Sequence, residues 1–222
     1  MCTKACLDFV RANLQAAEVK GRSVIEVGSR DVNGSVGPFV REFKPASYMG
    51  VDAIDGPGVD EICDASELVE RFGPERFDVL ISTEMLEHVR DWRTVVGQFK
   101  RVMKRDGILL ITTRSQGFPY HEFPHDFWRY ECSDIRTLFS DFKIEKLEKD
   151  QASPGVLFKA RKPADFREND MSGHELYSVI VNARVAIVTD SDLARFYRRR
   201  KRRRVLQTPE RAFRRIRTRL WK

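Results

Sequence analysis

The sequence predicts an α/β protein built on a doubly wound, mostly parallel seven-stranded sheet. Short apolar runs that suit buried strands alternate five times with helical patterns. Two further runs then flank Ser153-Pro154-Gly155, as in an antiparallel hairpin. This order of elements is typical of a parallel sheet that has helices on both faces and an antiparallel edge. A hydrophobic content of 41% in 222 residues is enough for such a core.

Each element follows from its local pattern. Residues 3–19 are expected to form an amphipathic helix, because Cys6, Phe9, Val10, Leu14 and Ala17 recur at helical spacing. Strands are expected at 23–27, 46–53, 59–63, 77–83 and 107–113, followed by the hairpin strands 143–149 and 155–161. Helices are expected at 34–43, 65–72, 91–104 and 133–142, the last with Ser133 as its N-cap. Residues 114–130 are expected to form a long loop rich in aromatic residues, proline and histidine.

The composition changes after Lys162, which predicts a main domain at 1–162 and an extension at 163–222. Residues 163–175 are expected to be loop, and residues 176–188 are ambiguous between helix and strand. Residues 198–204 are all Lys or Arg, and Thr208-Pro209-Glu210 is a helix-start pattern. The helix that follows would carry an apolar stripe of Phe213, Ile216, Leu220 and Trp221.

The positive charge is concentrated in this extension. Residues 195–222 hold 14 Lys or Arg and one acid, which leaves a formal charge of −6 for residues 1–194 out of the total of +7. The extension is expected to contact an anionic membrane surface, to bind nucleic acid, or to be a solvated charged end. A solvated end is the first expectation, as is usual for charge runs, and a membrane surface is the next; the acidic body disfavours nucleic acid.

Location is predicted from what the sequence lacks. Cys2, Cys6, Cys63 and Cys132 match no zinc motif and no disulfide framework, so reduced thiols are expected. The sequence has no apolar run of transmembrane length and no signal-peptide pattern. These features predict a cytoplasmic protein, located peripherally at a membrane if the extension binds one. The oligomeric state is not predicted.

A nucleotide-type cofactor is predicted from Val24 to Ser35. An apolar strand there ends in Glu26 and Gly28, and a polar turn and a helix start follow. Such a turn lets a ligand approach the backbone and the free N–H groups of the helix. Asp52 comes 24 residues after Gly28, at the end of the second strand, where an acid can accept hydrogen bonds from ribose hydroxyls. Arg30 stands where a dinucleotide site needs its second glycine, so an adenosine cofactor without a pyrophosphate is favoured.

The segments that bear these residues resemble the class I S-adenosylmethionine-dependent methyltransferases, which have a Rossmann-like fold. The similar segments are Glu26-Val-Gly28-Ser, Tyr48-Met-Gly50-Val-Asp52, Cys63-Asp64-Ala65, the strand and turn from Phe77 to His88, and the helix, turn and strand from Phe99 to Thr112. The resemblance covers roughly residues 20–161, in the usual order. The family often has glycines where this chain has Arg30 and Val32.

The resemblance implies S-adenosylmethionine as the cofactor and assigns residues to it. Gly28 and Ser29 would lie under its methionine part, with Glu26 just before the turn. Asp52 and Ala53 would meet the ribose, Asp64 and Ala65 the adenine, and Thr83 and Glu84 the methyl-bearing end.

The acceptor side is predicted in the loop from Phe118 to Tyr130, which follows the fifth strand. This loop resembles a His–Pro–Asp–Trp–Arg–Tyr loop in methyltransferases of sugar and surface-glycan pathways. His121, His125 and Asp126 are the candidate bases, because a hydroxyl acceptor has to lose a proton. The alternative is structural: Asp126 pairs with Arg129, and the histidines cap turns. A metal held by His121, His125 and Asp126 is conceivable but is not predicted.

The predicted function is methyl transfer from S-adenosylmethionine to a small molecule or glycan, with a sugar oxygen as the favoured acceptor atom. One alternative is an RNA or protein methyltransferase that the basic extension recruits. Another is a protein that binds the cofactor without catalysis and acts as a scaffold.

Overall fold

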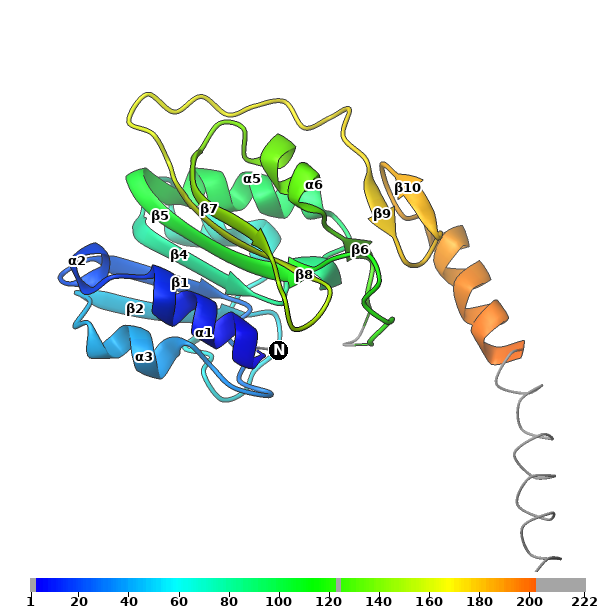
Figure 1. The fold of residues 1–222 in the computed structure, drawn as a ribbon, viewed down its shortest axis with the longest axis horizontal. Helices are drawn as coiled ribbons and strands as arrows, with labels where there is room; N and C mark the ends of the chain where they lie inside the picture. The colour runs from blue at the N-terminus through cyan, green and yellow to red at the C-terminus, as the bar shows by residue number, and fades with distance from the viewer. Residues whose placement is uncertain (1–2, 123–124, 203–222) are drawn as a thin grey trace, which may run out of the picture.

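The computed structural model describes residues 3–122 and 125–202. Its central sheet has seven strands in the order β3-β2-β1-β4-β5-β8-β7 (Figure 1). They are β1 (Ser23–Val27), β2 (Ser47–Asp52), β3 (Glu61–Ile62), β4 (Phe77–Thr83), β5 (Met103–Arg114), β7 (Lys143–Lys149) and β8 (Gly155–Arg161). Strands β1 to β5 are parallel, whereas β8 pairs antiparallel with both β5 and β7. The predicted fold class is confirmed.

The sheet is buried on both faces, because neighbouring residues of its central strands enter different cores. In β1, Val24 belongs to one apolar cluster and Ile25 to the other. The first cluster contains the helices α1 (Lys4–Asn13) and α3 (Gly37–Glu42), and the second contains α4 (Leu68–Phe72), α5 (Trp92–Val102) and α6 (Cys132–Leu138). Burial on both faces explains why these strands read as continuous apolar runs.

The N-terminal helix predicted at 3–19 is interrupted, which corrects the expectation. The chain becomes extended at Leu14, and α2 (Ala16–Val19) begins afresh. Gln15 and Glu18 form a capping box there, in which the Glu18 carboxylate accepts from the Gln15 backbone N–H at 3.0 Å. This reciprocal cap stabilises a second helix start and turns the chain toward β1.

Several other element boundaries also differ from the expectation, and the starts of one strand and one helix have a clear structural reason. Strand β5 begins at Met103, because Met103 pairs with Phe77 before the ladder shifts its register. Helix α6 begins at Cys132, and Glu131 rather than Ser133 caps it through a capping box with Asp134. Ser133 is therefore a helical residue.

The ambiguous segment 176–188 contains a hairpin. Its strands are β9 (Leu176–Ser178) and β10 (Ala183–Val185), and β9 also pairs with β6 (Trp128–Arg129) in the histidine-bearing loop. The resulting three-stranded sheet lies at one end of the large sheet (Figure 1). Leu176, Ile180 and Val188 enter the main core, so this part of the extension packs on the body.

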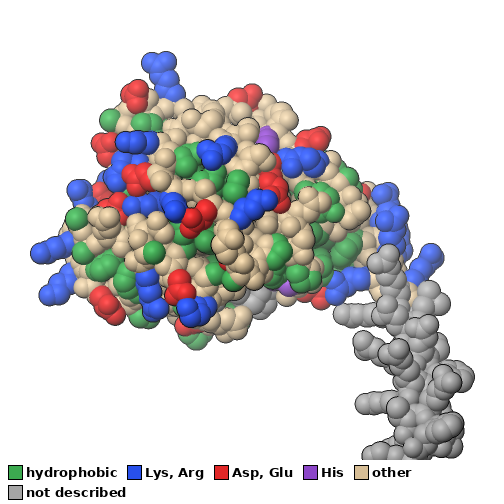
Figure 2. Space-filling model, viewed as in Figure 1, with side chains coloured by type: hydrophobic (Ala, Val, Ile, Leu, Met, Phe, Trp, Pro, Cys, Tyr) green, Lys and Arg blue, Asp and Glu red, His purple; other side chains and the backbone are tan. Residues whose placement is uncertain are grey.

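A helix at 190–202 follows the hairpin and leads away from the body (Figure 1). Lys and Arg side chains gather near its end in Figure 2, whereas both signs of charge are mixed over the rest of that face. The predicted helix from Thr208 lies outside the described residues. Within the described part of the chain, none of the helices is both long and apolar enough to cross a membrane. Cys63 and Cys132 are free thiols.

Candidate active site

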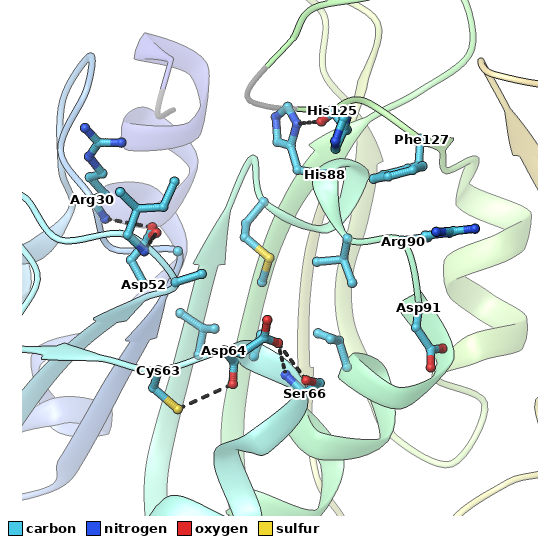
Figure 3. A pocket seen from close by; sticks show the side chains of 18 of the residues that line it. Arg30, Asp52, Cys63, Asp64, Ser66, His88, Arg90, Asp91, His125 and Phe127 are labelled. Atoms are coloured by element: carbon cyan, nitrogen blue, oxygen red, sulfur yellow. Dashed lines mark hydrogen bonds between the residues drawn. The ribbon is translucent and has the colours of Figure 1, made fainter. Parts of the chain in front are cut away.

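A cavity of about 490 Å³ opens at the carboxyl ends of β1, β2 and β4. Ligand sites of open α/β sheets lie at this edge, and the volume falls within the usual range for small-molecule pockets. In Figure 3, Arg30 and Asp52 lie on one side of the cavity and Cys63, Asp64 and Ser66 at its base. His88, His125, Phe127 and Arg90 lie on the opposite side (Figure 3).

The turn after β1 forms part of the cavity wall and has room only for glycine at position 28. Gly28 has a φ of +80°, and an added Cβ would lie 2.7 Å from the side chain of Met85. The N–H groups of Gly28 and Ser29 both donate to the Val51 carbonyl, at 2.9 and 3.0 Å. These bonds hold the turn against the end of β2 and bring Gly28 next to Asp52.

Asp52 is positioned by backbone donors from two loops. Its Oδ2 accepts from the Arg30 N–H at 3.4 Å, and its Oδ1 accepts from the Ile54 N–H at 3.0 Å. Ala53 and Ile54 continue the same wall, and the Ile54 side chain is 43% exposed. A carboxylate beside exposed apolar surface suits a ribose with its base.

Asp64 borders the same end of the cavity. Its Oδ1 accepts from the backbone N–H and the hydroxyl of Ser66, at 2.8 and 2.7 Å, and so caps the short 3-10 helix η1 (Ala65–Glu67). Ala65 lines the cavity behind it. Asp64 thus has the structural role of a helix cap at the position assigned to adenine.

Glu84 forms a buried ion pair at the end of β4. Its side chain is 4% exposed and pairs with Arg114 at the end of β5. Glu84 also accepts from the Cys6 thiol at 3.4 Å. Burial, together with the neighbouring charge of Glu87, raises the pKa of Glu84. The bond from Cys6 of α1 to Glu84 thus connects the N-terminal helix to a residue of the cavity wall.

Glu26 is buried beneath the cavity rather than in its wall. Its side chain accepts a hydrogen bond from the Tyr48 hydroxyl of the neighbouring strand. Burial raises the pKa of Glu26 to about 7, although the bond from Tyr48 lowers it. Glu26 therefore titrates near neutral pH.

The histidine-bearing loop is fixed by one buried ion pair. Arg129 donates to both oxygens of Asp126, from Nη1 to Oδ1 at 2.5 Å and from Nη2 to Oδ2 at 2.7 Å. Burial opposes ionisation of Asp126, but the bonds from Arg129 and His121 outweigh it and hold its pKa at about 2. The backbone N–H of His121 donates to Asp126 Oδ2 at 2.9 Å, and its Nδ1 lies 3.0 Å from the same oxygen.

The C-terminal helix completes the cavity. Leu193 lies in the wall, and the Tyr197 hydroxyl lies 2.7 Å from Nδ1 of His125. The same hydroxyl lies 3.1 Å from that of Tyr120. His125 is thus held between its own loop and the helix at 190–202.

The structure separates the predicted site residues into two groups. Those that line the cavity are Gly28, Asp52, Ala53, Asp64, Ala65, Glu84 and His125. Glu26, Ser29, Thr83, His121 and Asp126 lie behind this wall, and the Ser29 side chain packs against Gly50.

Several wall residues were not among the predicted ones. They include Arg30, Val32, Met85, His88, Phe127 and Leu193. Met85 and His88 lie within a motif that carries the resemblance, and Arg30 and Val32 directly follow the first motif, so their position in the chain indicates the site. Leu193 lies far from every motif, and the sequence has no pattern that would identify it.

Comparison with protein families identifies a methyltransferase domain over residues 3–151. The search of curated proteins gave no significant match. Many solved structures share the fold.

One of them is the 1,6-didemethyltoxoflavin-N1-methyltransferase of Burkholderia thailandensis, solved with bound 1,6-didemethyltoxoflavin and S-adenosylhomocysteine. It is 17% identical with a TM-score of 0.59, over 72% of this chain and 79% of that one. An S-adenosylmethionine-dependent methyltransferase of Mesorhizobium loti is 17% identical with a TM-score of 0.54, over 71% and 97%. The [4+2]-cyclase SpnF is 15% identical with a TM-score of 0.55, over 71% and 79%.

Proposed function

The chain belongs to the methyltransferase-domain family and uses S-adenosylmethionine, and from this premise we propose that it methylates a hydroxyl oxygen of a small molecule or glycan, with a sugar hydroxyl as the preferred acceptor. The observation that carries this proposal is that one cavity has residues suited to bind adenosine at one end and two histidines at the other. Asp52 lies at the first end, and His88 and His125 lie at the second (Figure 3).

The residues present fit the cofactor. Asp52 keeps lone pairs that can accept from two ribose hydroxyls, since its two backbone donors use one lone pair on each oxygen. Gly28 lines the cavity and packs against Met85 so closely that a side chain has no room there. Ile54 and Ala65 offer apolar surface to the adenine. The bound cofactor would supply an electrophilic methyl group on a sulfonium.

The residues of the chain then align the acceptor and accept the proton that its hydroxyl loses. The acceptor oxygen forms a bond to the methyl carbon as the carbon–sulfur bond breaks, and that electron pair stays on sulfur. The hydroxyl proton has to pass to a base. Phe127, Leu193 and Met85 surround this end of the cavity with apolar surface, which limits access of water.

His125 is the preferred base, because it lines the cavity and its Nδ1 is engaged by Tyr197, so Nε2 is left for the acceptor. Asp126 suits a positioning role, since Arg129 occupies both of its oxygens. His121 stands between Asp126 and the cavity wall and is the subject of the next section.

Calorimetric titration tests the cofactor half of this proposal. Wild-type protein should bind S-adenosylmethionine in the micromolar range and should not bind NAD. Asp52→Ala should weaken binding by about 10- to 100-fold, because it removes two hydrogen bonds to ribose. Asp55→Ala, in the same loop but outside the wall, is the matched control and should bind as the wild type does. Normal binding by Asp52→Ala would refute the ribose assignment.

An acceptor screen tests the other half, beginning with sugar nucleotides and lipid-linked glycans. S-adenosylhomocysteine formation should depend on the acceptor, and His125→Ala should lower kcat by about 100-fold or more while cofactor affinity changes little. Cofactor binding without turnover on any acceptor would instead support the scaffold alternative.

We further propose that the enzyme is cytoplasmic and that residues 195–222 bring it to an anionic membrane surface. Most of this segment, 203–222, lies outside the described residues. Co-sedimentation with anionic vesicles, absent for zwitterionic vesicles, is the expected result. Tighter binding to RNA than to vesicles, with activity that falls steeply with salt, would favour the RNA alternative.

A further inference from the structure

Three side chains outside the assigned cofactor contacts bring potential metal ligands together. They are Glu87 and His88 of the short helix η2 (Leu86–His88) and His121 of the histidine-bearing loop. One ligand atom from each lies within 4.8 Å of the other two. The rings of His88 and His121 meet edge to face, with centroids 4.7 Å apart.

Glu87 is a buried acid with one oxygen unused. Its side chain is fully buried, and its Oε2 accepts from the Thr113 hydroxyl at 2.9 Å. Its Oε1 has no hydrogen-bond partner among the described residues. The ion-pair partner that the described residues give it is His121, whose Nε2 lies 3.9 Å from Oε1. An unsatisfied buried carboxylate oxygen is costly unless a cation compensates it.

His88 presents a free ring nitrogen to the same place. Its Nδ1 lies 2.6 Å from the His125 carbonyl, which can only accept, so the proton is on Nδ1. Nε2 is then the atom with a lone pair, and it is buried with no hydrogen-bond partner among the described residues. A histidine bonded through Nδ1 to a backbone carbonyl is oriented as metal-binding histidines are.

His121 lies beside a carboxylate of its own loop. Its Nδ1 lies 3.0 Å from Asp126 Oδ2, and Arg129 in turn holds Asp126. This Nδ1–Oδ2 contact is an ion-pair contact without hydrogen-bond geometry, and Nε2 is the atom that faces Glu87, 3.9 Å from its Oε1. His88 thus has the supporting hydrogen bond that second-sphere partners supply at metal centres, and Asp126 lies close enough to supply one to His121 when its ring turns.

We propose that Glu87 Oε1, His88 Nε2 and His121 Nε2 bind a divalent transition-metal ion at the acceptor end of the cavity. Two imidazoles and one carboxylate suit zinc and its neighbours in the first transition series. Ligand–metal distances of about 2.1 Å require the three atoms to move about 1 Å closer, which side-chain rotation supplies. Three protein ligands leave a coordination position open, as in catalytic sites.

This site deepens the proposed function and rests on it for its role. His88 is itself part of the cavity wall, so the open position would face the acceptor. An acceptor oxygen bound there would be oriented, and its hydroxyl would ionise more easily. The substrate class narrows to acceptors with an exposed hydroxyl or diol that can enter the coordination sphere.

Metal binding can be tested without acceptor or cofactor. Protein freed of metal with a chelator is titrated with Co²⁺, and the visible absorption bands of ligated cobalt are recorded. One equivalent should bind, and Zn²⁺ should displace it. Glu87→Gln, His88→Asn and His121→Asn should each weaken binding about 100-fold or more. Gln keeps the acceptor for Thr113, and Asn keeps the donor at Nδ1, so these variants preserve the surrounding hydrogen bonds.

His125→Asn is the matched control, because it removes a neighbouring histidine of the cavity that is not in the ligand set. Its Co²⁺ affinity should equal that of the wild type. Loss of binding in His125→Asn, binding that survives all three ligand variants, or no Co²⁺ spectrum in the wild type would each overturn the proposal.

Measuring S-adenosylmethionine binding and Co²⁺ binding separately distinguishes a failure of the metal-site proposal from a failure of the proposed function. S-adenosylmethionine binding by His121→Asn, which lies outside the cavity wall, should be unchanged and shows that the variant is folded. If a ligand variant does not fold, paramagnetic shifts of the His88 and His121 ring protons in Co²⁺-loaded wild type decide the question. Co²⁺ binding without cofactor binding would refute the enzyme proposal and leave the metal site standing.

Discussion

Glu26→Gln should stabilise the protein, and the gain should grow with pH. The Glu26 side chain is 3% exposed, and burial raises its pKa from 4.5 to about 7. Below pH 4.5 the carboxyl is protonated in both the folded and the unfolded chain and has no effect. Above pH 7 it is ionised in both states, and the folded state bears the cost of a buried charge. The free energy of unfolding therefore falls as pH rises between these two values.

The pKa difference sets the magnitude. At about 1.4 kcal/mol for each unit, the full shift amounts to roughly 3 kcal/mol above pH 7. At pH 5 the ionisation of Glu26 lowers the free energy of unfolding by less than about 1 kcal/mol. The stability advantage of Glu26→Gln over the wild type should therefore increase by about 2–3 kcal/mol between pH 5 and pH 8. Glutamine keeps the shape of the side chain and an oxygen that can accept from Tyr48.

Urea unfolding of the cofactor-free protein at several pH values measures this difference. Tyr48→Phe is the informative companion variant, because the Tyr48 hydroxyl lowers the pKa of Glu26. Without it the pKa should rise further, and the loss of stability should extend to higher pH. A stability difference between wild type and Glu26→Gln that stays constant from pH 5 to pH 8 would refute the reasoning.

Two further substitutions test features of the core and the cavity. Gly28→Ala should weaken cofactor binding and cost about 1–3 kcal/mol of stability, because it combines a positive φ with a contact on Met85. Gly73→Ala has a similar φ of +84° but nothing within 4 Å of the added Cβ, so urea unfolding of the two variants separates strain from contact. Lys100→Met should destabilise the protein by about 3–5 kcal/mol, because fully buried Lys100 donates to Asp141 Oδ2 at 2.7 Å and its loss leaves that carboxylate unpaired. A double variant with Asp141→Asn should recover part of this loss, and failure to recover any would show that the ion pair is not the cause.

The fold class could be predicted because the central strands of the large sheet are apolar on both faces. A run such as Phe77–Thr83 suits a strand that is buried on both faces, and the alternation of such strands with helices then gives parallel pairing. The helix break near Leu14 depends instead on a capping box between Gln15 and Glu18. Ser133 is the favoured cap by residue type, whereas the structure uses Glu131, which forms a capping box with Asp134.

The candidate site likewise has residues that could be predicted from the sequence and residues that could not. Asp52 and Gly28 follow strand ends, so topology alone brings them together at one edge. Leu193 reaches the cavity, and Tyr197 contacts His125, because the C-terminal helix packs on the histidine-bearing loop. No local pattern encodes that contact. The same holds for His121, whose neighbours Glu87 and His88 lie more than 30 residues away in the chain.

The pairing of β6 with β9 has a consequence for where the chain can be cut. Trp128 and Arg129, between Asp126 and the buried Tyr130, form their ladder with residues 177 and 178. A chain that ended at residue 162 would keep all seven strands of the large sheet. It would nevertheless leave β6 as a bare strand edge and uncover the apolar surface beneath Leu176 and Ile180. A fragment of that kind would be prone to self-association, so residues 163–202 act as a protective cover as well as a wall of the site.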